Sequence, residues 1–113
     1  MYDGDKMIVI DWEYGGQNDP YYDAAGPLTE NLMYEEMTEV WLNAYFGGEP
    51  TAEQRARVMV NRFLYCTYWS VWSLVQIMNG KDEEVYWPYG EERAVLGLEY
   101  MNDPKFAEYL ELL

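Results

Sequence analysis

Two tryptophans are the residues whose type and spacing point most directly to chemistry. Trp69 and Trp72 lie three residues apart in an apolar stretch, in step with Tyr65 and Gln76, so on a helix they share one face. Such a stripe forms plain core more often than a binding site. Two indoles one turn apart also suit a quaternary ammonium, because cation–π attraction contributes about 0.5–2 kcal/mol per ring. Further walls for such a pocket are available from Tyr68, Tyr86 and Tyr89.

Glu30 is the carboxylate that departs from the pattern of its neighbours. If residues 28–46 form one helix, Glu30 projects onto the apolar face. A buried, isolated carboxylate is costly, so it must lie at a rim, be paired, or bind a cation. The alternative is a hydrated acid in the first helical turn, where the dipole favours it. The apolar face carries Met33, Met37, Val40, Trp41 and Ala44, and the solvated face carries Glu35, Glu36 and Glu39.

Asp11 is a candidate metal ligand. It ends a β-branched, apolar run that begins at Lys6, and Glu13 lies two residues further on. Acids at the end of a strand commonly hold the Mg²⁺ that bridges phosphates in phosphoryl transfer. Aspartate also begins ordinary turns, so the position by itself is weak evidence.

The elements that must position these residues are mostly helical. We expect a strand over 6–12, a loop over 15–27, and helices over 28–46, 52–79, 89–102 and 104–112. The hairpin signal Asp3-Gly4-Asp5 is preceded by only two residues, so a partner strand is missing. The sequence therefore predicts a single, mainly α unit over 1–113. Its segment 1–14 is read as the strand or hairpin remnant of a larger fold.

Composition narrows the classes of function. Seven Lys and Arg stand against 21 Asp and Glu, and a net charge of −14 argues against binding a nucleic-acid backbone. Such a charge suits a cationic ligand or a basic partner. The chain has no histidine, which excludes histidine-based catalysis and histidine metal sites, and the single Cys66 fits a reducing cytoplasm. The apolar run over 63–75 is too short to span a bilayer, so no membrane segment is expected.

Four segments, in order, resemble the choline/ethanolamine kinase family of the aminoglycoside-phosphotransferase-like group. Val9–Asp23 (VIDWEYGGQNDPYYD) resembles the stretch that follows the family's catalytic loop, and Glu30 lies seven residues after Asp23 as the family's pocket glutamate does. The segment 69–76 (WSVWSLVQ) resembles the choline-pocket helix. Tyr89 and Arg93 match a third family segment, Tyr-x-x-x-Arg. The residues of the first segment resemble those of bacterial choline kinases in particular.

The resemblance implies a role for each matching position. Asp11 is implied to bind Mg²⁺, with Glu13 beside it, in an enzyme that uses ATP. Glu30, Trp69, Trp72 and Tyr89 are implied to form the site for choline, ethanolamine or a similar small cation, with Arg93 as its support. Asn18 and Asp23 are implied to be structural. The implied fold is the helical C-terminal subdomain of a protein-kinase-like fold.

The departures from the family are as informative. Nothing in the chain resembles the nucleotide-binding lobe, its phosphate-holding lysine or the catalytic loop with its base, and Gly26-Pro27 replaces a polar pair before the pocket helix. We therefore expect no catalytic residue, no bound ATP or Mg²⁺ and no activity from this chain alone. It would be a truncated product or one half of a split enzyme. Uncovered apolar surface predicts a homo-oligomer. A non-enzymatic amine-binding module and a helical interaction module stay open as alternatives.

Overall fold

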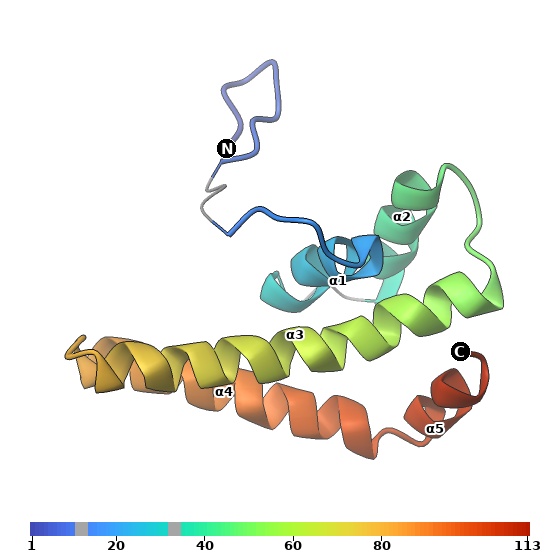
Figure 1. Cartoon of the computed structure of the whole chain (residues 1–113). Helices are drawn as coiled ribbons and strands as arrows, with labels where there is room; N and C mark the ends of the chain where they lie inside the picture. The colour runs from blue at the N-terminus through green and yellow to red at the C-terminus, as the bar shows by residue number, and fades with distance from the viewer. Residues whose placement is uncertain (11–13, 32–34) are drawn as a thin grey trace.

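Five helices make up the described part of the chain. The computed structural model describes residues 1–10, 14–31 and 35–113, with helices α1 (Pro20–Glu30), α2 (Glu35–Phe46), α3 (Ala52–Met78), α4 (Glu83–Asn102) and α5 (Pro104–Glu111). Figure 1 shows α3 as the long central helix, with α4 running antiparallel beside it and α1 and α2 on the opposite side. After α4, the chain turns into α5, which contacts α3 again. The predicted mainly helical fold is confirmed.

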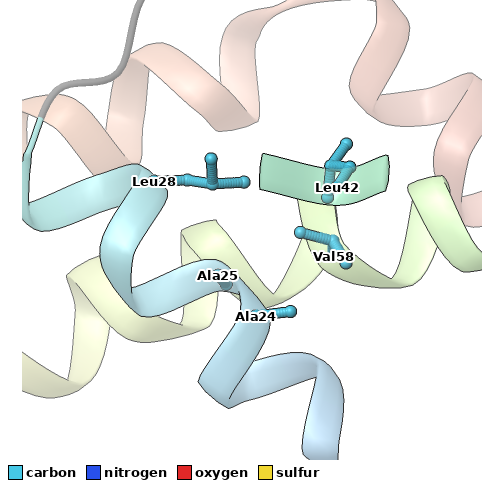
Figure 2. Close-up of a cluster of buried hydrophobic side chains, with 5 residues drawn as sticks. All are labelled: Ala24, Ala25, Leu28, Leu42 and Val58. Atoms are coloured by element: carbon cyan, nitrogen blue, oxygen red, sulfur yellow. The ribbon is translucent and has the colours of Figure 1, made fainter. Parts of the chain in front are cut away.

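The apolar core lies where α1, α2 and the first half of α3 meet. Figure 2 shows its five fully buried members, which come from all three helices. Tyr21, Trp41, Phe46 and Met59 pack around them at partial exposure. Because burial of apolar side chains is the main force that joins helices, this cluster fixes α1 against α3. Its members are Ala24, Ala25, Leu28, Leu42 and Val58.

The second half of α3 packs against α4 through small residues. A Cβ atom added at Gly90 would lie 2.7 Å from Cβ of Ser73, and one added at Gly97 would lie 3.1 Å from Cβ of Cys66. The hydroxyl of Ser73 also donates to the carbonyl of Tyr86 on α4. The two backbones approach each other closely here because these glycines carry no side chain.

Local signals predicted two helices closely. Thr51 and Gln54 form the expected capping box, so α3 begins where it was predicted, and it ends one residue short of 79. Asp103 caps α5 and Pro104 is its first residue, as expected. A side chain that satisfies a free backbone N–H acts within one turn, which is why such signals can be recognised in the sequence.

The predicted helix over 28–46 is wrong. α1 already begins at Pro20, with Asp19 as its N-cap, and contains Gly26 and Pro27, which were expected in a loop. α1 ends at Glu30 and α2 begins at Glu35. Pro27 removes one helical hydrogen bond, yet burial of its neighbours against α3 outweighs that loss. Similarly, α4 begins six residues before the predicted position 89 and includes Pro88.

The expected apolar face of α2 is not the buried one. Thr38 and Leu42 are buried, whereas Met37 and Val40 are 52% and 71% exposed. Together with Trp41, the exposed side chains border a shallow hollow of about 410 Å³. Hydrophobic periodicity gives the direction of an apolar stripe but does not say which partner covers it. Met33 and the side chain of Glu35 lie outside the described residues.

The N-terminal segment forms a turn rather than a full strand. Gly4 adopts a positive φ of 99°, and Tyr2 pairs with Met7 in a single antiparallel bridge. Over the described residues 6–10 the predicted strand is reduced to that bridge, and Ile8 and Ile10 are about half exposed. An extended segment needs a neighbouring strand for its ladder, and the backbone hydrogen bonds described for this segment run to Met1 and Asp3. No helix among the described residues has the length and apolarity required to cross a membrane.

Candidate functional site

A paired carboxylate marks the place where α1 meets α4. Glu30 is the last residue of α1, where an acid is unfavourable to the helix dipole. Arg93 of α4 compensates it: Nη2 lies 2.7 Å from Oε2 of Glu30, and Nε donates to Oε1 at 3.3 Å. The Arg93 side chain is only 5% exposed, against 33% for Glu30. Of the alternatives considered for Glu30, the structure therefore shows pairing, not a hydrated acid in a first turn.

Two tyrosines surround this ion pair. The hydroxyl of Tyr89 donates to Oε1 of Glu30 at 3.0 Å, and its ring lies beneath the Arg93 guanidinium, 4.8 Å from centroid to Cζ. Burial, followed by the charge of Glu30, raises the pKa of Tyr89 to about 12. The same two causes raise the pKa of Tyr65 on α3. Tyr65 therefore lies within the electrostatic reach of Glu30.

Tyr65 connects this pair to the two tryptophans. Its ring centroid is 5.8 Å from that of Trp69, and Trp69 lies 5.2 Å from Trp72. On the far side, Trp72 contacts Tyr86 of α4 at 5.6 Å. Aromatic pairs at such separations stabilise each other in tilted or edge-to-face arrangements. The result is a continuous aromatic cluster along the second half of α3, which begins beside Glu30 and ends at α4.

Tyr14 closes the cluster from outside the helices. Its ring meets Trp69 at 5.7 Å and Trp72 at 6.4 Å, edge-on in both cases. Its hydroxyl accepts a hydrogen bond of 3.2 Å from Nε1 of Trp72. Tyr14 remains 58% exposed. It therefore covers the indoles without being buried itself, and it brings the N-terminal segment to this part of α3.

The structure places the predicted site residues in three ways. It gathers Glu30, Tyr89 and Arg93 around one ion pair, with Trp69 and Trp72 linked to them through Tyr65. The predicted metal ligands Asp11 and Glu13 lie outside the described residues. The predicted structural residues Asn18 and Asp23 take no part in the contacts of the cluster described above. Oδ1 of Asn18 accepts from the amide of Asp19, and Asp23 is exposed in the first turn of α1.

Sequence reasoning missed Tyr14 and Tyr65 as part of this cluster. Tyr65 was assigned to the stripe of α3 but not to the surroundings of Glu30. Tyr14 follows the Asp-Trp-Glu motif directly, and that adjacency was the only available signal. A residue on a loop has no helical period, so its partners are set by the path of the chain.

The arrangement is suited to a small organic cation. Trp69, Trp72 and Tyr14 present indole and phenol rings, and the faces of such rings attract cations. Glu30 supplies a carboxylate whose position is held by two hydrogen-bonding partners. Because Arg93 already compensates its charge, most of the attraction must come from the rings. Over the described residues, no cluster of carboxylate or cysteine side chains is spaced to hold a metal ion.

Comparisons with known proteins show which proteins this chain is similar to. Protein LicA of Haemophilus influenzae is 31% identical over 84 residues, which cover 69% of this chain and 32% of the relative. A second LicA sequence from that species is 31% identical and covered to 25%. The solved choline/ethanolamine kinase family protein of Mesorhizobium loti superposes with a TM-score of 0.87 and 30% identity, covering 96% of this chain and 37% of that one. No protein-family profile matches the chain.

This chain belongs to the choline/ethanolamine kinase family, as the resemblance predicted. It spans about a third of the length of the relatives that it matches.

Proposed function

We propose that this chain carries the amine-binding part of a phosphotransferase that phosphorylates choline, ethanolamine or a similar small amino alcohol. The observation that carries the proposal is the aromatic cluster of Trp69, Trp72 and Tyr14 beside the Glu30–Arg93 pair. Two features of the cluster support the proposal: aromatic rings, which attract a cationic head, and a carboxylate held in place that could accept a hydrogen bond from the hydroxyl of the amino alcohol. Membership of the family supplies the class of reaction.

In this proposal the N-terminal segment supplies the metal ligands. Asp11 precedes Tyr14 by three residues, so the chain keeps their Cα atoms within about 11 Å of each other. Tyr14 contacts both indoles. Asp11, with Glu13 nearby, would hold the Mg²⁺ that neutralises the phosphates of ATP close to the amino alcohol. When bound, that metal supplies charge neutralisation, and the residues of this chain supply substrate binding and orientation.

We also propose that the 113 residues by themselves bind the amine without transferring phosphate. The kinase-family protein of known structure is nearly three times as long as the matched region. Phosphoryl transfer depends on positioning both substrates and the metal, which needs more of a kinase fold. Incubation of the 113-residue chain with ATP, Mg²⁺ and choline should yield no phosphocholine. Measurable turnover would contradict this part of the proposal and leave the amine site standing.

The amine site is tested by calorimetric titration of the chain with choline. Choline should bind saturably, and the uncharged 3,3-dimethylbutanol, which has the same shape, should bind far more weakly. Trp72→Leu removes one ring and should weaken choline binding about 2- to 30-fold. Trp87→Leu is the matched control, because Trp87 lies on α4, is 48% exposed and makes none of the ring contacts described above.

Three results would overturn the amine site. The first is the absence of saturable choline binding to the folded chain. The second is equal affinity for choline and its neutral analogue, because the rings would then act only by burial. The third is equal weakening by Trp72→Leu and Trp87→Leu, which would place the ligand elsewhere.

Self-association is the remaining part of the proposal. Met37 and Val40 present apolar surface on α2, and apolar surface of this kind commonly marks a contact site. We expect a dimer or larger assembly of the 113-residue chain by light scattering, reduced by Val40→Glu. A monomeric mass at high concentration would contradict it. The test is separate from choline binding, because Val40 lies on α2 and makes no contact described for the aromatic cluster.

A further inference from the structure

The cationic side chains of this acidic chain are unevenly distributed. The chain has seven Lys and Arg residues against 21 Asp and Glu. Three of the seven line one cavity of about 450 Å³, which is bounded by α2, α3, the end of α4, and α5. These three are Arg55, Arg62 and Lys105. The carboxylates in the same lining are Glu39 and Asp103. The cavity therefore carries a net positive charge in a molecule whose overall charge is −14.

Arg62 is one of the three cationic residues that line this cavity. Nη2 donates to the backbone carbonyl of Leu28 at 3.4 Å and to the hydroxyl of Tyr100, whose ring lies 4.4 Å below Cζ. These partners are uncharged. Its Nε is buried and has no hydrogen-bond partner among the described residues. A buried N–H without a partner costs free energy, so Arg62 would gain from an acceptor that reached it.

The two carboxylates of the lining are already engaged. Both oxygens of Glu39 accept from Arg55, at 2.5 and 2.8 Å. Oδ1 of Asp103 caps α5 by accepting from the amide of Lys105 at 2.9 Å. No described ion pair involves Arg62 or the Lys105 side chain. The charges of these two residues therefore remain available to a ligand that enters the cavity.

We propose that this cavity binds a small organic anion whose carboxylate or phosphate meets Arg62 and Lys105. Arginine and lysine bind such oxyanions through charge-assisted hydrogen bonds. Tyr100, Phe106 and Tyr109 complete the lining and suit an apolar or aromatic body on the same ligand. The volume lies within the range of small-molecule sites.

This anion site is separate from the amine site. Arg62 and Trp69 lie on the same helix, seven residues apart, which corresponds to about 10 Å along its axis. α5 and the end of α4 complete the anion cavity, whereas Tyr14, the end of α1 and the first half of α4 complete the amine site. The proposal therefore does not depend on the function proposed for the aromatic cluster.

The test is a calorimetric titration of the 113-residue chain at low salt. Titration with phenyl phosphate and with benzoate shows whether a phosphate or a carboxylate is preferred. Inorganic phosphate shows how much the aromatic ring of the ligand contributes to binding. Benzyl alcohol is the uncharged control. One of the two aromatic anions should bind saturably and benzyl alcohol should not. Lys105→Gln should weaken that binding about 3- to 10-fold. Lys81→Gln removes the same charge at the exposed turn between α3 and α4 and should change nothing.

A second variant tests the contribution of Arg62 to anion binding. Arg62→Met retains much of the length of the side chain and should weaken binding more than about 10-fold, provided that circular dichroism shows a folded helical chain. Choline affinity should stay unchanged in Lys105→Gln. The proposal is overturned if neither aromatic anion binds saturably, if benzyl alcohol binds as well as they do, or if Lys105→Gln and Lys81→Gln weaken binding equally.

Discussion

The two halves of α3 face different chemical environments, one cationic and one aromatic. Its first half presents Arg55 and Arg62 to a cavity completed by α2, α4 and α5. Its second half presents Trp69 and Trp72 to a cluster completed by Tyr14 and α4. A single helix of 27 residues spans about 40 Å, which is long enough to keep two such environments apart. The partner elements, more than the helix itself, decide what each half of α3 can bind.

The two halves also differ in what holds them. The first half is fixed by the buried cluster that it shares with α1 and α2 (Figure 2). The second half lies along α4 (Figure 1) and relies on the close approach of the two backbones at Gly90 and Gly97. The Glu30–Arg93 pair joins the two regions, because it ties the end of α1 to the middle of α4. Three predictions follow from this difference in support.

Loss of the Glu30–Arg93 ion pair should reduce the stability of the fold more than the other two changes. Arg93→Met leaves Glu30 without its cation and should lower the free energy of unfolding by about 1.5–3 kcal/mol, because it removes two charge-assisted hydrogen bonds of a buried guanidinium, whereas Glu30 itself stays partly exposed to solvent. Equilibrium unfolding in urea measures this loss of free energy. Arg57→Met is the control, since the Arg57–Asp19 pair lies at the surface with 3.7 Å between its atoms and should contribute less than about 1 kcal/mol. Equal losses would show that Arg93 does not join the two regions.

The close approach of α3 and α4 should give an intermediate effect. Gly90→Ala places a methyl group 2.7 Å from Cβ of Ser73, so one helix must shift. Overpacking costs about 1–3 kcal/mol, and the better helix propensity of alanine returns up to about 1 of it. Thermal unfolding should show a net loss. Gly16→Ala, which has nothing within 4 Å of the added atom, is the control. A stabilised Gly90→Ala protein would mean that α4 is less tightly packed than described.

The smallest effect should appear at high pH. Burial and the charge of Glu30 raise the pKa of Tyr89 to about 12, whereas an unfolded tyrosine titrates near 10. The unfolded chain therefore loses this proton first. The stability that Tyr89 contributes is complete below about pH 10 and is lost as the pH rises through about 12. Melting temperatures measured from pH 8 to 12 should fall less steeply for Tyr89→Phe than for Tyr2→Phe. Equal slopes would contradict the contact between Tyr89 and Glu30.

Much of the helical framework could be predicted from local chemistry. Thr51 with Gln54, and Asp103 with Pro104, mark helix starts through contacts within one turn. The starts of α1 and α4 were predicted eight and six residues too late, and the segments that were missed contain Pro27 and Pro88. Their local cost is real, but packing against α3 exceeds it, and that packing depends on residues far away in the sequence.

Composition and residue spacing alone indicated a helical, acidic chain that carries Glu30, Trp69, Trp72, Tyr89 and Arg93 at spacings typical of its family. Only the tertiary structure decided which of these side chains meet. It paired Glu30 with Arg93 over 63 residues of chain and brought Tyr14 onto Trp72 over 58. Periodicity acts along one helix, whereas these contacts arise where separate elements are packed together by burial of their apolar faces.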